Sequence, residues 1–230
     1  MTNTTERGLT KLTIMLFAPM YQNFERQLDN IPLSRDALLD IVIAQEIPRL
    51  REELQGKKLS NAANRYISQS LKRLGGKDAP PLRKVSIAVK HETAEALRQV
   101  VNEHNLVRDS VINRLIVLLR ASDDLLKSLG LPIRVRSFRR DGTEDMPTTP
   151  LRVIEETLID PFYYLRAACI DGNGCGLSLL AFPEQLVGMS VYLADDQVPG
   201  TKDHSAAEDL WTDILSTLTP TTQKTKNPGA

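Results

Sequence analysis

The chain has 230 residues, of which 41% are hydrophobic and 25% are charged, and its formal net charge at pH 7 is zero. This composition indicates an ordinary folded protein with one large domain or two small ones. No apolar run approaches the roughly 18 residues that a membrane-spanning helix needs, and the polar N-terminus has no apolar segment of the signal-peptide type. We therefore expect a cytoplasmic protein with no membrane partner.

The neutral total conceals two oppositely charged halves. Residues 1–140 contain 24 Lys and Arg against 15 Asp and Glu, a net charge of +9. Residues 141–230 contain 5 against 14, a net charge of −9. A basic half joined to an acidic half suggests a polyanion-binding module with an acidic appendage, although folded enzymes show such asymmetry too.

The first elements expected along the chain are a strand and two helices. Residues 11–17 alternate between apolar and polar side chains, which predicts a half-buried strand. Apolar residues at helical spacing then predict a helix that ends at the turn signal 29–32. Ser34 is suited to cap a second, long helix that reaches residue 54 and that Pro48 is expected to kink or end.

An additional helix and a linker follow this unit. Ser60 is suited to cap a helix at 60–74, which Gly75 and Gly76 should stop. Residues 75–83, GGKDAPPLR, contain Gly-Gly and Pro-Pro breakers and are expected to form the linker.

The pattern of strand, helix, turn and helix then repeats at an offset of 73 residues. In the second copy the first helix should end near Asn105, a residue type that tolerates the left-handed capping conformation. The pair Arg35-Asp36 falls on the pair Arg108-Asp109. Because four element lengths and this pair match, we interpret residues 11–54 and 84–121 as two copies of one unit.

The acidic half predicts a smaller C-terminal α+β domain over residues 132–218. Hairpin-turn chemistry at Asp171-Gly172-Asn173-Gly174 favours a strand on each side of it. The other expected elements are strands at 133–140 and 188–194, helices at 151–160 and 206–218, and a disordered tail at 219–230. The expected fold class is therefore α+β, with a mainly helical N-terminal half.

The repeated unit resembles the ribbon-helix-helix superfamily of the Arc and MetJ repressors. The resemblance rests on a strand of about seven residues, two helices and the polar turn that opens the second helix. The closer match is the second copy, KVSIAVKHETAEALRQVVNEHNLVRDSVINRLIVLLRAS. One such unit cannot bury a sufficient core, so the resemblance implies that two units pair their strands antiparallel. Here the tandem copies can pair within one chain, as a pseudo-dimer in residues 9–127.

The resemblance also implies which residues contact DNA. Base contacts would come from the solvent-facing residues of a ribbon in the major groove, which are Lys11, Thr13, Met15, Lys84, Ser86 and Ala88. Phosphate contacts would come from the N-terminus of the second helix of each copy, which holds Ser34, Arg35, Val107 and Arg108.

Catalytic motifs are absent from the sequence. It contains no H-E-x-x-H, G-x-S-x-G or Gly-rich phosphate loop, and its three histidines are scattered. Cys169 and Cys175 fit neither a zinc site nor a C-x-x-C pair, and we expect them to be small buried residues on adjacent strands. We therefore expect no enzyme, no cofactor and no metal.

The expected function is sequence-specific binding of double-stranded DNA in transcriptional regulation. Tandem ribbon-helix-helix chains also resemble DNA-binding accessories of conjugative relaxosomes or plasmid partition systems. A third interpretation is a protein-interaction scaffold of antitoxin type. The acidic C-terminal part is expected to contact a protein partner or a second copy of the chain, which would make a homodimer.

Overall fold

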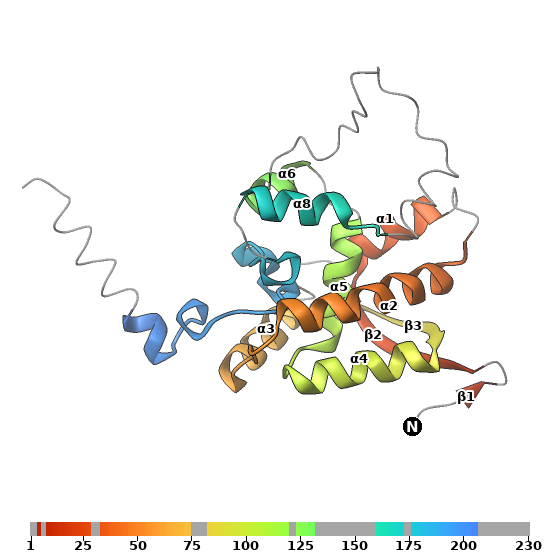
Figure 1. The fold of residues 1–230 in the computed structure, drawn as a ribbon, viewed down its shortest axis with the longest axis horizontal. Coiled ribbons are helices and arrows are strands. Elements are labelled where there is room, and N and C mark those ends of the chain that lie inside the picture. The colour runs from red at the N-terminus through yellow and green to blue at the C-terminus, as the bar shows by residue number, and fades with distance from the viewer. Residues whose placement is uncertain are drawn as a thin grey trace, which may run out of the picture.

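The computed structural model describes residues 4–5, 8–28, 33–74, 82–119, 123–131, 160–172 and 176–206. The strands are β1 (Thr4–Thr5), β2 (Leu9–Phe17) and β3 (Leu82–Lys90). The α-helices are α1 (Ala18–Leu28), α2 (Arg35–Glu53), α3 (Asn61–Arg73), α4 (His91–Glu103), α5 (Arg108–Leu119), α6 (Asp123–Ser128) and α8 (Tyr163–Gly172). The 3-10 helices η2 (Leu177–Leu179), η3 (Glu184–Met189) and η4 (Asp195–Gln197) follow α8 (Figure 1). The predicted α+β class with a mainly helical N-terminal half is confirmed at this level.

The duplication predicted from the sequence is visible in the element boundaries. The members of each pair β2 and β3, α1 and α4, and α2 and α5 begin 73 residues apart. The predicted linker was too long at its end, because β3 already begins at Leu82. Asn105 takes the expected left-handed conformation with φ +54°. The Ser34 and Ser60 side chains accept hydrogen bonds from the backbone N–H groups three residues later, at Ala37 and Ala63.

The sheet has the order β1-β2-β3, with both neighbouring pairs antiparallel. β2 and β3 pair within the one chain over their full lengths, from Leu9 opposite Lys90 to Phe17 opposite Leu82. At the centre Thr13 lies opposite Ser86, which is its own counterpart at the 73-residue offset. The β2–β3 ribbon therefore has a pseudo-two-fold axis through this pair.

The two repeats are intertwined around the ribbon. α2 of the first repeat packs against β3 and α4 of the second, and α5 of the second repeat packs against β2 and α1 of the first. Figure 1 shows the two strands running between α2 and α4. Ile14 and Ile87, on the helix-facing side of the ribbon, are 1% and 0% exposed. Because each repeat completes the core of the other, neither buries a sufficient apolar surface alone.

Pro48 neither ends α2 nor divides it. The helix runs without interruption from Arg35 to Glu53. Pro48 and Ala44 both lie on the exposed side of the helix. Because proline has no backbone N–H, Pro48 donates no hydrogen bond to the Ala44 carbonyl. Water can bond this exposed carbonyl instead, which reduces the usual cost of an interior proline.

The strands predicted in the C-terminal part are wrong wherever the structure describes that part. Residues 163–172 form helix α8, and the predicted strands at 175–182 and 188–194 are 3-10 helices and irregular segments over their described residues. The reason is helical spacing, since Leu165 and Cys169 of α8, and Phe162 just before it, are all buried. Cys169 is thus buried on a helix. The strand predicted at 133–140, almost all of the helices predicted at 151–160 and 206–218, and Cys175 lie outside the described residues.

The described C-terminal residues share one hydrophobic core with the two repeats. η3 packs on α3 so closely that a Cβ atom added to Gly188 would lie 2.3 Å from the backbone nitrogen of Leu71. The boundary predicted near residue 132 remains a prediction, because residues 132–159 are not described. Nonetheless, the described residues 160–172 and 176–198 are packed as part of the same body as the N-terminal half.

One buried and one half-buried arginine attach this segment to the repeats. Arg114 of α5 is 2% exposed and donates hydrogen bonds to the carbonyls of Leu177 and Leu180, the latter at 3.0 Å. Burial lowers the pKa of Arg114 to about 10. Arg166 of α8 pairs with Glu46 and Glu53 of α2.

Among the described helices, none combines the length and apolarity that crossing a membrane requires.

Candidate nucleic-acid interface

The six predicted base-contact residues all lie on the open face of the ribbon, opposite the helices. Lys11, Thr13, Lys84 and Ser86 are exposed, and Met15 and Ala88 are half-buried. They form three cross-strand pairs, Lys11 with Ala88, Thr13 with Ser86 and Met15 with Lys84. The sequence therefore predicted the face correctly, whereas their contact with DNA stays a prediction.

The central pair is close enough for contact between its side chains. Thr13 Oγ1 and Ser86 Oγ lie 3.3 Å apart, and either atom can donate. Such proximity is typical of a pair whose backbone groups point outward, away from the partner strand. Hydroxyls at the centre of the face and a lysine on each side give the ribbon donors and acceptors along its open surface. Neither strand contributes an Asp or Glu to it.

α5 holds the outer edge of β2. The backbone N–H of Met15 donates to Asp109 Oδ2 at 3.0 Å, and the N–H of Phe17 donates to Asn113 Oδ1 at 2.9 Å. Asn113 also donates from its amide to the carbonyl of Met15 at 2.8 Å. These bonds satisfy strand groups that would otherwise be open to a further strand.

α2 holds the outer edge of β3 in the same manner. The N–H of Ala88 donates to Asp36 Oδ2 at 2.9 Å, and the N–H of Lys90 donates to Asp40 Oδ1 at 2.8 Å. Each of these bonds is the counterpart, at the 73-residue offset, of a bond between α5 and β2. The pseudo-two-fold symmetry therefore extends from the register of the ribbon to its side-chain clamps.

The predicted phosphate contacts lie at the two edges of the ribbon. Arg108 Nη2 donates to the carbonyl of Thr13 at 2.6 Å, and Arg35 Nη2 donates to the carbonyl of Ser86 at 3.0 Å. Each arginine also pairs with the aspartate that follows it in the sequence. Both arginines thus have a structural role in fixing the ribbon, and phosphate binding by them stays a prediction.

Ser34 and Val107 differ in what they can offer an anion. The Ser34 hydroxyl accepts from the N–H of Ala37 at 3.2 Å and is therefore engaged as a helix cap. Val107, its counterpart, has no side-chain donor, so its contribution to a phosphate site would come from backbone N–H groups at the start of α5.

Arg35 has a more enclosed environment than Arg108. Its Nη1 donates to the hydroxyl of Tyr21 at 2.6 Å. Burial alone would lower the pKa of Arg35, but the hydrogen bonds that Arg35 donates to Asp36 and Tyr21 outweigh burial and raise it. Burial is also the main reason why the pKa of Tyr21 rises to about 12. Arg35 is therefore positively charged, and Tyr21 neutral, at every physiological pH.

Sequence reasoning missed the four residues that clamp the ribbon. It noted that the Arg-Asp pair recurs, but it assigned no role to Asp36 and Asp109. Asp40 and Asn113 were overlooked, although each is a polar residue on the buried side of an otherwise apolar helix. A short polar side chain at the same place in both repeats is the signal that could have identified them.

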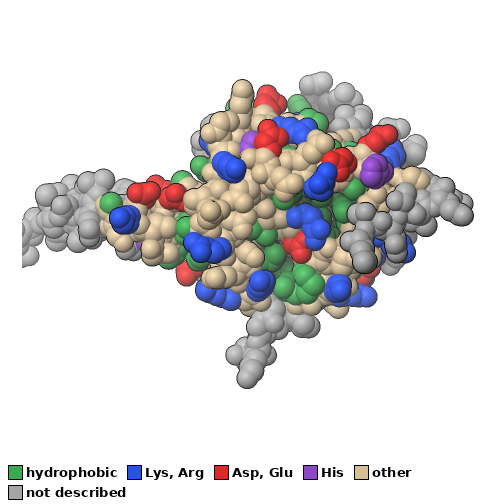
Figure 2. Space-filling model, turned by 90° about the horizontal axis from the view of Figure 1, so that it is seen from below, with side chains coloured by type: hydrophobic (Ala, Val, Ile, Leu, Met, Phe, Trp, Pro, Cys, Tyr) green, Lys and Arg blue, Asp and Glu red, His purple; other side chains and the backbone are tan. Residues whose placement is uncertain are grey.

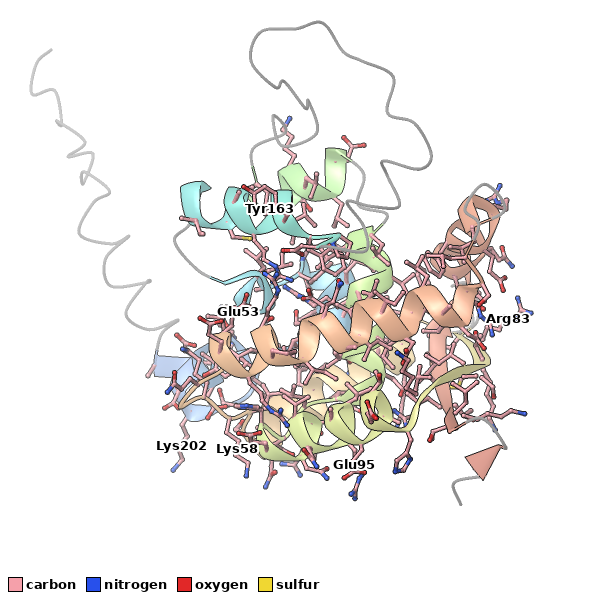
Figure 3. All side chains as sticks on the ribbon, turned by 45° about the vertical axis from the view of Figure 1, so that its right-hand side comes forward. Glu53, Lys58, Arg83, Glu95, Tyr163 and Lys202 are labelled. Atoms are coloured by element: carbon pink, nitrogen blue, oxygen red, sulfur yellow. The ribbon has the colours of Figure 1, made fainter. Side chains whose placement is uncertain are left out.

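Within the described residues, no group of three or more His, Cys, Asp or Glu converges as a metal site would require. Figure 3 shows Arg83, Glu95 and Glu53 at widely separated places on the molecule. A search among protein-family models, curated proteins and solved structures found no match to this chain.

Proposed function

We propose that this protein binds double-stranded DNA sequence-specifically, as a transcriptional regulator, with the β2–β3 ribbon in the major groove. In this proposal the two repeats form a ribbon-helix-helix pseudo-dimer within one chain. The observation that carries it is the pairing of Thr13 with its counterpart Ser86. That register gives the ribbon a two-fold axis at its centre, as a protein reading two half-sites of a duplex requires.

The dimensions and charge of the ribbon support the proposal. The major groove is about 12 Å wide and admits two strands that lie about 4.8 Å apart. Lys11, Lys84 and Lys90 are exposed on the open face. Lysine can donate to O6 and N7 of guanine, and hydroxyl groups such as those of Thr13 and Ser86 pair with several bases.

The two halves of the face are similar but not identical. Lys11 and Lys84 occupy equivalent positions, whereas Met15 is the counterpart of Ala88. Both of these apolar residues can touch a thymine methyl, but they differ in reach. We therefore expect an imperfect inverted repeat, with a guanine in each half and unequal selection at the position that Met15 or Ala88 faces.

Selection from random duplex DNA, followed by fluorescence anisotropy on the selected site, tests the proposal. Lys84→Ala should weaken binding by about 1–3 kcal/mol and relax base preference at one position. Lys58→Ala is the matched control, because it removes the same charge from an exposed site outside the ribbon (Figure 3). Log affinity should fall linearly with log salt concentration, by about 0.9 per phosphate contacted.

Two results would overturn the proposal. One is the failure of selection to enrich any sequence. The other is equal binding by the Lys84→Ala variant, the Lys58→Ala variant and the parent protein. Absence of duplex binding at low salt, together with a co-purifying protein, would favour the scaffold interpretation instead.

A further inference from the structure

A cleft of about 880 Å³ opens beside the second repeat. It lies between β2, α4, the start of α5 and the end of α3, and much of its wall is apolar, including Leu12, Leu71, Leu97 and Val101. Figure 2 views the molecule from the side of α4 and shows hydrophobic side chains exposed among Lys and Arg side chains on this face. A space of this volume is typical of small-molecule sites.

The corresponding place in the first repeat is filled by a tyrosine side chain. Tyr21 is 1% exposed, and its hydroxyl accepts a hydrogen bond from Arg35 Nη1 at 2.6 Å. The guanidinium of Arg83 lies over the ring, 5.8 Å from its centre. Glu25 pairs with both arginines at 3.7 Å. An aromatic ring and its polar neighbours thus close the space between β3 and α1.

The second repeat has a different residue at each of these positions except the arginine on α5. Ala94 stands in the place of Tyr21, Thr10 in that of Arg83 and Arg98 in that of Glu25. All three line the cleft. The side chain of Arg98 pairs with Glu95 at 2.6 Å. The replacement of a tyrosine by an alanine therefore accounts for the open space.

Arg108 keeps the geometry of its counterpart at this cleft. Its Nη2 donates to a ribbon carbonyl and its Nε to Asp109, as the same atoms of Arg35 do for Ser86 and Asp36. Nη1, the atom that in Arg35 bonds the tyrosine hydroxyl, has no hydrogen-bond partner among the described residues. A ring bearing an oxygen acceptor would complete in the second repeat the arrangement that Tyr21 completes in the first.

We propose that the cleft binds a small phenolic molecule. Its ring lies between β2 and α4, as the ring of Tyr21 lies between β3 and α1, and its oxygen accepts from Arg108. The apolar wall of Leu12, Leu97 and Val101 excludes water from the ring. Because the cleft is larger than one ring, substituents that extend toward Leu71 should increase affinity. This site shares Met15 and Arg108 with the residues predicted to contact DNA, but its test uses no DNA.

Titration of the full chain with 4-methylphenol, which is the tyrosine side chain as a free molecule, tests this proposal. Amide shifts in a ¹H–¹⁵N spectrum should move saturably for α4 and the start of α5. Toluene has the same ring without the oxygen and should bind at least several-fold more weakly. Absence of saturable binding, or equal binding of toluene, would overturn the proposal on the unaltered protein.

Two variants on α4 locate the site. Ala94→Tyr should fill the cleft and weaken 4-methylphenol binding at least tenfold. Gln99→Tyr adds the same side chain at an exposed position of α4 that does not line the cleft, and it should bind the probe as the parent does. Undiminished binding by the Ala94→Tyr variant would place the probe elsewhere and refute the assignment. If that variant fails to fold, the comparison of 4-methylphenol with toluene still decides whether the phenolic oxygen contributes to binding.

Discussion

Replacement of Ile87 by alanine tests which face of the ribbon supports the fold. The side chain of Ile87 is 0% exposed and lies on the helix-facing side of β3. The substitution removes three buried carbon atoms, which corresponds to about 2.4 kcal/mol at roughly 0.8 kcal/mol for each buried methylene. The cavity that remains adds to this loss, and isoleucine-to-alanine changes in cores cost about 2–5 kcal/mol. We expect the free energy of unfolding to fall by about 3–4 kcal/mol.

Urea unfolding followed by far-UV circular dichroism measures this loss. Folded domains have a free energy of unfolding of about 5–15 kcal/mol, so the midpoint should shift markedly while the variant still folds. Ser86→Ala is the neighbouring control, because Ser86 is exposed on the open face and its hydroxyl contact with Thr13 is 3.3 Å long. It should change stability by no more than about 0.5 kcal/mol.

The opposite ranking would refute the reasoning. If Ser86→Ala were strongly destabilising and Ile87→Ala neutral, the register would be displaced by one residue. Every side chain of the strand would then point to the other face. The set of residues proposed to contact bases would change with it.

Three further predictions concern the clamps and the buried groups. Asp109→Ala should cost about 1–3 kcal/mol in urea unfolding, because the N–H of Met15 loses its acceptor; a neutral effect would mean that the clamp is dispensable. The pKa of the Tyr21 hydroxyl is raised to about 12, so the hydroxyl's contribution to the free energy of unfolding is present below pH 10 and is lost as the pH rises toward 12. Tyr21→Phe should remove this contribution to the loss of stability at alkaline pH, and a variant with the same pH profile as the parent would contradict the prediction. Burial raises the pKa of Glu46 above its ordinary 4.5 despite its pairing with Arg166. The parent should therefore gain stability relative to Glu46→Gln as the pH falls from 7 toward 4.5, and a constant difference between the two would argue against burial of the charge.

Short-range patterns in the sequence predicted the repeated units and their capping residues. The alternation around Thr13 and Ser86 identified the open face, because side chains of a strand point alternately to its two sides. Ser34 and Ser60 were identified as caps because a cap requires only its own residue and the next three. These features depend on neighbours in the chain, and for that reason they could be read without the fold.

The C-terminal part shows where such local patterns mislead. The Asp-Gly and Asn-Gly pairs at 171–174 suggested a hairpin, but the segment before them is helix α8. Leu165 and Cys169 of this helix, and Phe162 just before it, are buried in the core shared with the two repeats, and α8 packs against η2. A short apolar segment fits either a strand or a helix, and the surface available for packing decides between them.

What the sequence determined by itself was the repeat of 73 residues and the alternation of its strands, because both follow from local periodicity. Only the tertiary structure decided how the repeats meet. The pairing of Thr13 with Ser86 joins residues 73 positions apart, and the bond between Asp109 and Met15 spans 94. The cleft is recognisable only in the folded structure as well, because the fold puts Ala94 of the second repeat at the position where Tyr21 fills the equivalent space in the first. Contacts of this kind depend on surfaces that exist after both repeats have folded together, and no local pattern specifies them.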